Sequence, residues 1–455
     1  MDRSLLAVPG AAAVALASRG LAPLPPDAAT MLAITLFCIV LWVADPVPPW
    51  FVGLVCIGLV GVAFSPSLAL SGFGLSATWL IVVGAVVGRA TRRSGLGEFA
   101  QTRLLARLRA SAVEDARRLY LHLLAVLSAG ALALALLLPS AIVRVLVLAP
   151  LLAEVGEGFE SKRARLGLFL GPLLTTWYGG AGILTANLPN IVTVGVLEST
   201  TDATVTWSEW FALLFPITGV ARMLVIAGVV YYLYRPAPRT AVRLPGDPDR
   251  STTGEERRML AFLLLGVTVW ATDFLHGLHP LFGALLVATL ALAPPFGVLS
   301  FDQVGEIDFS IVFFVGAVFA IAEGLQRTGF TDTAARSLLA LVPADAGLPL
   351  VALAVFLFTG ALMVLMEGVA VASVLTPVVA TYAQQAGLPV LPVVFAEVLA
   401  LDTLYFLPFQ SIVLVTILGQ GVVETRDLVV TTTACTLLIT VLLVPLQFLV
   451  LLWLT

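Results

Sequence analysis

The sequence predicts an all-α polytopic membrane protein with about 11 transmembrane helices, two re-entrant helical hairpins, and two inverted-topology repeats that contain broken helices. Hydrophobic residues make up 60% of the 455-residue chain, charged residues make up 11%, and the mean hydropathy is +1.05. Apolar runs of membrane length, about 17 to 25 residues, recur along nearly the whole chain. A soluble core does not need this share of apolar residues, so we expect the chain to lie in a lipid bilayer.

Composition and motifs exclude several function classes. The net charge of −4 and the lack of a basic run interleaved with aromatic residues argue against a nucleic-acid partner. Cys38, Cys56 and Cys435 lie in apolar runs without metal-ligand spacing, which argues against a zinc or disulfide framework. The chain lacks the His-Glu-x-x-His and Gly-x-Ser-x-Gly motifs of membrane-embedded enzymes, and it lacks the continuous polar stripe of a channel. We therefore expect a transporter and no enzyme, with sodium as the one cofactor that the sequence leaves open.

The N-terminus and the charged loops predict the orientation. The apolar run Leu5–Ala17 follows Arg3 and could be a signal peptide, but a second apolar segment starts at Met31, which favours a first transmembrane helix. Arginines outnumber acids eight to three over 89–118 and six to four over 235–258, so both segments are expected in the cytoplasm. We expect an integral protein of the bacterial inner (plasma) membrane with a cytoplasmic N-terminus.

A proline-rich linker, 237–258, separates two similar halves, 28–236 and 259–455. Val83-Gly84-Ala85-Val86 in the first half matches Val315-Gly316-Ala317-Val318 in the second, and three further matches follow in the same order. The connection after the first match is rich in arginine, whereas its counterpart is nearly balanced in charge. Opposite sidedness of two copies would produce this difference. Inverted repeats place a binding site near the bilayer midplane, where broken helices meet.

Each half contains a segment that is expected to leave the helical conformation. Glycines, amides and a proline crowd Gly179–Asn190, between two apolar runs. Because the bilayer core offers no water to exposed backbone groups, such a break survives only where protein or a wet cavity covers it. We expect the helix that begins near Leu166 to unwind there, and its counterpart to unwind between Asp402 and Ser411, where Pro408 gives a weaker signal.

Two further segments are expected to fold back as hairpins. Leu121–Leu138 is followed by Pro139-Ser140, and Val351–Leu365 is followed by Glu367-Gly368. A helix that starts at such a tip exposes backbone N–H groups, and its positive dipole end favours anions. An ordinary pair of tilted helices with a proline kink is the alternative.

The order of hairpin, glycine-rich break, tryptophan-flanked helix (Trp207–Tyr234), linker and second copy resembles the divalent anion/sodium symporter family within the ion transporter superfamily. The resemblance covers roughly 30–455, and its most specific part is Gly179–Asn190 with the preceding Thr175-Thr176. It implies an elevator-like transporter of dicarboxylates, citrate or sulfate, working by sodium symport or exchange. It also implies a scaffold that forms a homodimer, made of 28–119 and 259–346, and a mobile transport part, made of 120–236 and 347–455.

The chain departs from the family at its most polar positions. The family carries Ser-Asn-Thr at each hairpin tip, whereas this chain has Ser140-Ala141-Ile142 and Glu367-Gly368-Val369, and Gln410 replaces an asparagine at the second break. The expected substrate-binding residues, for a small anion, are Ser140, Arg144, Asn187, Pro189, Asn190, Glu367, Gly368, Gln410 and Ser411. The expected sodium site consists of Ser140, Gly180, Gly182, Thr185 and Asn187.

Arg144, Glu367 and Asp402 are ionisable groups at the depth of the hairpins and breaks. An unpaired charge in the bilayer costs about 2.5 kcal/mol or more, so such residues are usually functional or paired. Arg144 and Glu367 could form an ion pair that holds the hairpins together. Alternatively, Arg144 anchors the substrate and Glu367 or Asp402 carries a proton, which would make the chain a proton-linked carrier, antiporter or oxyanion carrier. For Arg222, Asp273, Glu323 and Glu397 we expect snorkelling or interhelical pairing.

Overall fold

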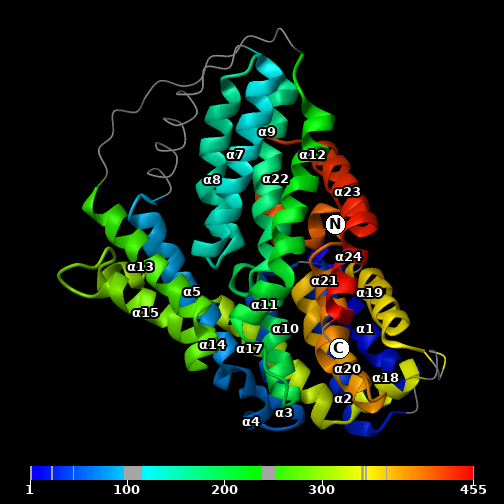
Figure 1. The fold of residues 1–455 in the computed structure, drawn as a ribbon. Helices are drawn as coiled ribbons and strands as arrows, with labels where there is room; N and C mark the ends of the chain where they lie inside the picture. The colour runs from blue at the N-terminus through cyan, green and yellow to red at the C-terminus, as the bar shows by residue number, and fades with distance from the viewer. Residues whose placement is uncertain are drawn as a thin grey trace.

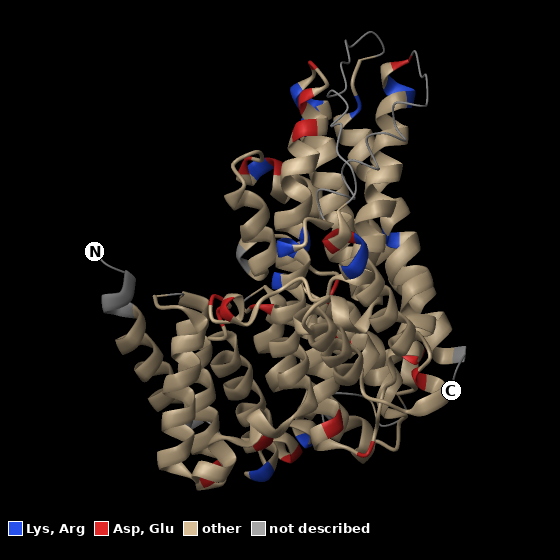
Figure 2. Ribbon diagram, turned by 90° about the vertical axis from the view of Figure 1, so that its left-hand side faces the viewer, with Lys and Arg blue, Asp and Glu red and all other residues tan. Residues whose placement is uncertain are grey.

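The computed structural model describes residues 3–21, 24–44, 46–96, 115–237, 253–339, 343, 346–364 and 366–453. All regular elements in these ranges are helices, as predicted. The arginine-rich stretch 97–114 and most of the linker, 238–252, lie outside the described residues. Figure 2 shows that long stretches of the helices carry no charged residue, and that a group of charged residues lies at mid-height in the view, besides those at its top and bottom.

Four stretches of the described chain are long and apolar enough to cross a membrane. They are α2 (Pro26–Ala44), α7 (Ala116–Leu137), the helix Trp207–Tyr234 formed by α11 (Trp207–Leu214), the π-helical η5 (Phe215–Ala221) and α12 (Arg222–Tyr234), and Thr425–Leu452 from α23 (Thr425–Leu442) and α24 (Val444–Trp453). A fifth candidate is bent by 73° between α17 (Ile311–Arg327) and α18 (Phe330–Leu339). The other apolar segments are shorter helices or broken pairs, consistent with a polytopic protein built on interrupted spans.

One group of helices surrounds α5 (Ser76–Arg93) and α17. α5 packs against α15 (Pro280–Leu292), which packs against α13 (Gly254–Ala271), as seen at the left of Figure 1. α17 packs against α3 (Pro49–Ala63), where a Cβ on Gly53 would lie 2.5 Å from the carbonyl oxygen of Phe313. α1 (Arg3–Leu21) packs against α2. Three short helices complete this group, namely α4 (Pro66–Ala69), α14 (Asp273–His276) and α16 (Phe301–Val304).

A second group contains the hairpins and the broken helices. α7 and α8 (Ala141–Glu157) turn at Pro139-Ser140 and both pack against α9 (Lys162–Leu174), together with α12 at the top of Figure 1. α19 (Leu348–Met363) and α20 (Gly368–Gln385) turn at Glu367 in the same manner. Both predicted turns are therefore present.

Both predicted helix breaks are present as well. After α9 the chain passes through a π-helical turn, Thr175–Gly179, and two short 3-10 turns, and α10 (Leu188–Thr200) then continues the span. In the second half, α21 (Val390–Leu401) and α22 (Ile412–Gly419) are separated by ten irregular residues with one 3-10 turn, Pro408–Gln410. Because α9 and α10 are equally long, at 13 residues or about 20 Å each, the break lies near the middle of the path that they form together.

Candidate functional site

The two breaks face each other through Asn187 and Asp402. Asn187 Nδ2 donates to Asp402 Oδ1 at 3.3 Å and to the carbonyl oxygen of Trp177 at 3.4 Å. Beside this contact, the ring of Tyr405 lies 5.4 Å from that of Trp177 and 5.7 Å from that of Tyr178. The prediction that the two unwound segments meet is therefore confirmed.

Local sequence explains why the first break leaves the α-helix. Pro172 lies inside α9 and removes a helical hydrogen bond there, and Pro189 lies in the first turn of α10, where it has no N–H to donate to a preceding turn, so the helix begins at that point. Gly182 permits a close approach between the break and η5, because a Cβ there would lie 2.8 Å from Phe215 Cα. The break is thus shaped by its own prolines and by packing against η5.

Arg144 is fully buried and donates all five of its N–H groups to neutral acceptors. These acceptors are the hydroxyl and carbonyl oxygens of Thr176 (2.9 and 3.0 Å), the carbonyl oxygens of Leu138 (2.7 Å) and Ala186 (2.9 Å), and Asn187 Oδ1 (3.4 Å). Leu138 lies at the first hairpin tip, and Thr176, Ala186 and Asn187 lie at the break. Arg144 therefore joins the hairpin tip to the break.

The ion pair between Arg144 and Glu367 that the sequence left open is not formed. Within the described ranges, no carboxylate lies within 4.0 Å of the Arg144 guanidinium. Glu367 is half-buried and instead accepts from the backbone N–H of Val369 at 2.8 Å, which caps α20. Each of the two residues therefore makes its hydrogen bonds within its own repeat.

Both hairpin tips lie beside other functional candidates. Ser140 caps α8 by accepting from the N–H of Val143 at 3.4 Å. Gly368 lies against Pro189, since a Cβ on this glycine would be 3.5 Å from Pro189 Cγ. The second hairpin tip therefore contacts the first break.

The second break is held by Gln410. Its Oε1 accepts from the backbone N–H groups of Phe406 and Leu407, both at 2.7 Å, and its Nε2 donates to the carbonyl oxygens of Met363 (2.7 Å) and Leu404 (3.1 Å). Met363 ends the first arm of the second hairpin, so Gln410 joins that hairpin to its break as Arg144 does in the first repeat. The neighbouring Ser411 caps α22 by accepting from the N–H of Val413 at 3.2 Å.

The predicted sodium-site residues Gly180, Gly182, Thr185 and Asn187 lie together on the first break, with Asn190 at the start of α10. Thr185 Oγ1 accepts from Trp207 Nε1 at 3.2 Å, and Asn190 Nδ2 donates to the carbonyl oxygens of Ala181 and Ile183. Ser140 has no hydrogen bond to these residues in the described part of the chain.

Four buried polar atoms around the breaks have no hydrogen-bond partner among the described residues. They are Thr175 Oγ1, Trp177 Nε1, Asn190 Oδ1 and Asp402 Oδ2. Buried polar atoms usually have a hydrogen-bond partner, so a ligand or water could supply the missing bond at each of these four atoms. The sequence analysis missed Trp177, for which the only signal was its place next to the Thr175-Thr176 motif.

The sequence also did not indicate that Arg222 contacts the second break. It is buried on α12 and donates to the backbone oxygens of Asp402 (2.8 Å) and Tyr178 (3.3 Å) and to Thr403 Oγ1 (2.6 Å). The Arg222 guanidinium thus binds the second break at the backbone of Asp402. The position of Arg222 in an apolar run was the available signal, but a partner 180 residues away cannot be identified from one sequence.

Interhelical pairing is present for two of the other three residues. Asp273 accepts from backbone N–H groups of α11, and buried Glu397 accepts from Thr376 Oγ1 of α20 at 2.9 Å, whereas Glu323 pairs with Arg327 of its own helix, α17, at 2.5 Å. None of the three contacts Asn187 or Asp402.

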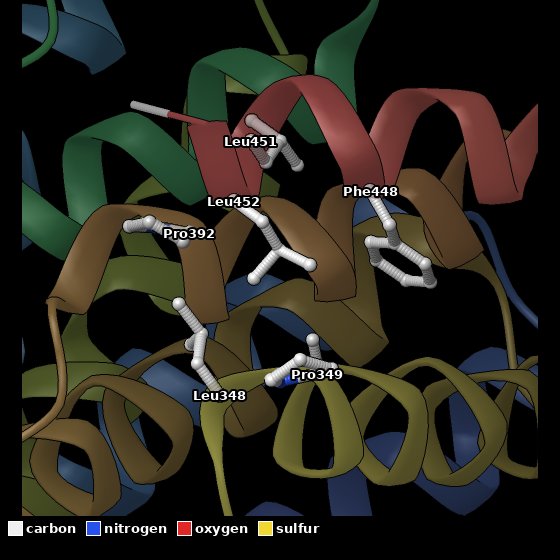
Figure 3. Close-up of a pocket in the computed structure, with 7 residues that line it drawn as sticks. Leu348, Pro349, Pro392, Phe448, Leu451 and Leu452 are labelled. Atoms are coloured by element: carbon white, nitrogen blue, oxygen red, sulfur yellow. The ribbon is translucent and has the colours of Figure 1, made fainter. Parts of the chain in front are cut away.

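A cavity of about 60 Å³ lies away from the breaks, between α19, α21 and α24. Figure 3 shows its apolar lining, formed by Leu348, Pro349, Ala352, Pro392, Phe448, Leu451 and Leu452. Without a charged or hydrogen-bonding side chain in this lining, the cavity offers nothing to an anion. The breaks therefore remain the candidate site.

A family model described as the sodium:sulfate symporter transmembrane region matches residues 5–455. The chain belongs to the sodium:sulfate symporter family. The resemblance to divalent anion/sodium symporters is thereby confirmed, and this family member is an integral membrane protein.

Curated relatives of this sodium:sulfate symporter family member include L-tartrate/succinate antiporters of Escherichia coli (strain K12) and Shigella dysenteriae serotype 1. Both are 24% identical to the chain, over 331 and 332 residues respectively. Each match covers 63% of this chain and 64% of the relative, which is less than two thirds of the relative's length.

Two solved structures share the fold of this family member. The YdaH transporter of Alcanivorax borkumensis has a TM-score of 0.57 and 14% identity, over 94% of this chain and 98% of that chain. MtrF of Neisseria gonorrhoeae, from a class of antimetabolite efflux pumps, has a TM-score of 0.51 and 10% identity, over 96% of this chain and 97% of that chain. At these identities the likeness concerns the fold alone.

Proposed function

We propose that this protein carries a small anion of the dicarboxylate, citrate or sulfate class across the bacterial plasma membrane by alternating access. The observation that supports this most is the contact between Asn187 and Asp402, where the two broken helices meet beside the hairpin tips. Inverted repeats that meet in this way form substrate sites in secondary transporters. The L-tartrate/succinate antiporters among the relatives favour dicarboxylates over sulfate.

The substrate would bind between the breaks and the hairpin tips. Ser140 and Gly368 mark the N-terminal ends of α8 and α20, where backbone N–H groups favour an anion. Asn187, Pro189, Asn190 and Ser411 line the breaks that face these ends. In the present conformation Arg144 and Gln410 are engaged within the protein, so their proposed role is to shape the site, and a direct contact with the anion would require them to exchange partners.

The movement between inward and outward states would be elevator-like. The first hairpin meets α5 across small residues, since a Cβ on Gly84 would lie 3.7 Å from Pro139 Cγ and one on Gly88 would lie 3.2 Å from Val143 Cγ2. Small residues let helices approach closely without interlocking side chains. We propose that 120–236 and 347–455 move against a dimeric scaffold made of 28–119 and 259–346, with the N-terminus in the cytoplasm.

Coupling to protons is the second candidate and competes with coupling to sodium. Glu367 and Asp402 supply carboxyl groups at a hairpin tip and a break, where the family pattern has neutral residues at the tip. Asp402 Oδ2 is buried and lacks a hydrogen-bond partner among the described residues, which suits a proton or cation acceptor. Thr185, Asn187 and the carbonyl groups of Gly180 and Gly182 would serve sodium instead.

Counterflow in proteoliposomes tests the function. Vesicles with purified protein are loaded with unlabelled anion, and uptake of labelled succinate, tartrate, citrate and sulfate is measured with and without sodium or a proton gradient. We expect saturable counterflow of a dicarboxylate that is lost in Asn187→Ala and retained in Gly228→Ala, because a Cβ on Gly228 would meet no atom within 4 Å. Absence of counterflow for all four anions with monodisperse wild-type protein would contradict the proposal.

A further inference from the structure

We infer that Trp207 is a positioning residue that ties the first broken helix to the α13–α15 helices through Asp273, so that the geometry at Thr185 depends on this tie. The inference rests on the proposed function only where it concerns substrate affinity. The tie itself consists of contacts that can be tested without a substrate.

Asp273 is 2% exposed and both of its carboxylate oxygens bind the start of α11. Oδ2 accepts from the backbone N–H of Trp207 at 2.6 Å, and Oδ1 accepts from that of Ser208 at 3.3 Å. α11 already has its own capping box, in which Thr206 and Glu209 bind each other's backbone N–H groups. Asp273 is therefore an additional cap from an element 66 residues away, and a carboxylate at a helix N-terminus is a strong contact.

The indole of Trp207 continues the connection to the break. Its ring stacks on Phe211 (4.9 Å, 9°) and on Trp270 of α13 (6.2 Å, 24°). Its single donor, Nε1, binds Thr185 Oγ1 at 3.2 Å. Thr185 makes no other side-chain hydrogen bond in the described part of the chain, so its own hydrogen and second lone pair remain for a ligand.

Trp210 is a built-in control on the same helix. Its Nε1 donates to the carbonyl oxygen of Ala181 at 3.2 Å, and its ring packs on Phe395, but it contacts neither Asp273 nor Trp270. Both tryptophans thus donate to the first break, and only Trp207 is also held by the α13–α15 helices.

This arrangement makes the orientation of Thr185 dependent on the state of the transporter. If the break moves relative to α13–α15, the Asp273 cap or the Trp207 stack must be lost, and the indole no longer holds Thr185 in one orientation. A ligand that uses Thr185 would then bind the two states with different affinity, which is how binding can be coupled to movement.

Hydrogen exchange of the 181–190 segment tests the tie without substrate. Trp207→Phe keeps the stacking ring and removes the N–H donor, and Asp273→Asn removes the charge of the cap. We expect exchange in 181–190 to rise about three- to tenfold in each variant, the range of one lost hydrogen bond, and not to rise further in the double variant. Two outcomes would overturn the inference. The first is unchanged exchange in Asp273→Asn. The second is an increase in the single variants no larger than that of Trp210→Phe, together with a Trp207→Phe/Asp273→Asn double variant in which the two increases add.

Succinate counterflow then separates positioning from structure. In Trp207→Phe and Asp273→Asn we expect KM to rise about three- to tenfold with kcat within twofold of wild type, as in Thr185→Val. An unchanged KM in both variants, with an altered KM in Thr185→Val, would show that the tie does not reach the site. If Trp207→Phe does not yield monodisperse protein, Asp273→Asn together with Thr185→Val decides the same question. A wild type without counterflow would contradict the proposed function and leave the exchange result standing.

Discussion

Asn187 and Asp402 lie 215 positions apart in the sequence, yet Asn187 Nδ2 is 3.3 Å from Asp402 Oδ1. Asn187 also accepts from Arg144, and the backbone of Asp402 accepts from Arg222. One amide thus connects the polar networks of the two repeats at the point where both helices are unwound. Substitutions in this pair should therefore affect both repeats together.

Asn187→Ala should abolish succinate counterflow and lower the free energy of unfolding by about 1 to 3 kcal/mol, because it leaves a buried N–H of Arg144 and the buried Oδ1 of Asp402 without their partner. Thermal unfolding and counterflow of the same preparation measure both effects. Asn190→Ala is the matched comparison, since Asn190 binds only carbonyl oxygens of its own break and should cost less stability. Full transport by a stable Asn187→Ala variant would refute the role of this residue.

Arg144→Lys should destabilise the protein by about 2 kcal/mol or more, although it preserves the charge. Five acceptors surround the planar guanidinium, and an ammonium group offers three donors from a single point. Thermal unfolding in detergent gives the measurement. A Lys variant with wild-type stability and only weakened succinate affinity would instead identify Arg144 as the substrate anchor.

If a proton carried by Glu367 is the coupling ion, Glu367→Gln should keep exchange of the anion while losing dependence on a proton gradient. A glutamine oxygen can still accept from the N–H of Val369, so the cap of α20 is retained, but the group no longer carries a proton. In wild type we expect uptake to rise as external pH falls and to need little sodium. Strict sodium dependence in wild type, with the same pH response in the Gln variant, would leave Glu367 as a helix cap. Glu367→Ala, which also loses the cap, separates the two effects.

Gly195→Ala should slow transport by disturbing the contact of α10 with α5 and α17. A Cβ at this position would lie 2.6 Å from Ala77 Cβ and 2.8 Å from the ring of Phe319, so α10 must shift away. Overpacking of this kind costs about 1 to 3 kcal/mol in the conformation concerned. The counterflow rate at saturating succinate provides the readout, with Gly228→Ala as control. An unchanged rate would mean that this contact is not retained during transport.

Local signals in the sequence were sufficient to locate the hairpin tips and breaks, because glycine and proline act on the backbone at their own positions. Pro139-Ser140 and Gly179–Asn190 were found in this way. The partners of Arg144 could not be predicted, because they are mainly backbone carbonyl groups, which every residue carries. The ties made by Arg222 and Trp207 depend on side chains that the fold brings together from distant positions. Gln410 illustrates the same limit, since its sequence position suggested a ligand contact and its amide is engaged by the protein.

The neutral surroundings of Arg144 also have an electrical consequence. Among the described residues no carboxylate lies within 4.0 Å of the Arg144 guanidinium, and its five acceptors are all uncharged. A segment that carries this guanidinium along the membrane normal moves a positive charge through the transmembrane field, which is worth about 2.3 kcal/mol per unit charge per 100 mV for a complete crossing. Membrane voltage would then bias the position of the protein itself, even during an exchange of anions that is electrically silent.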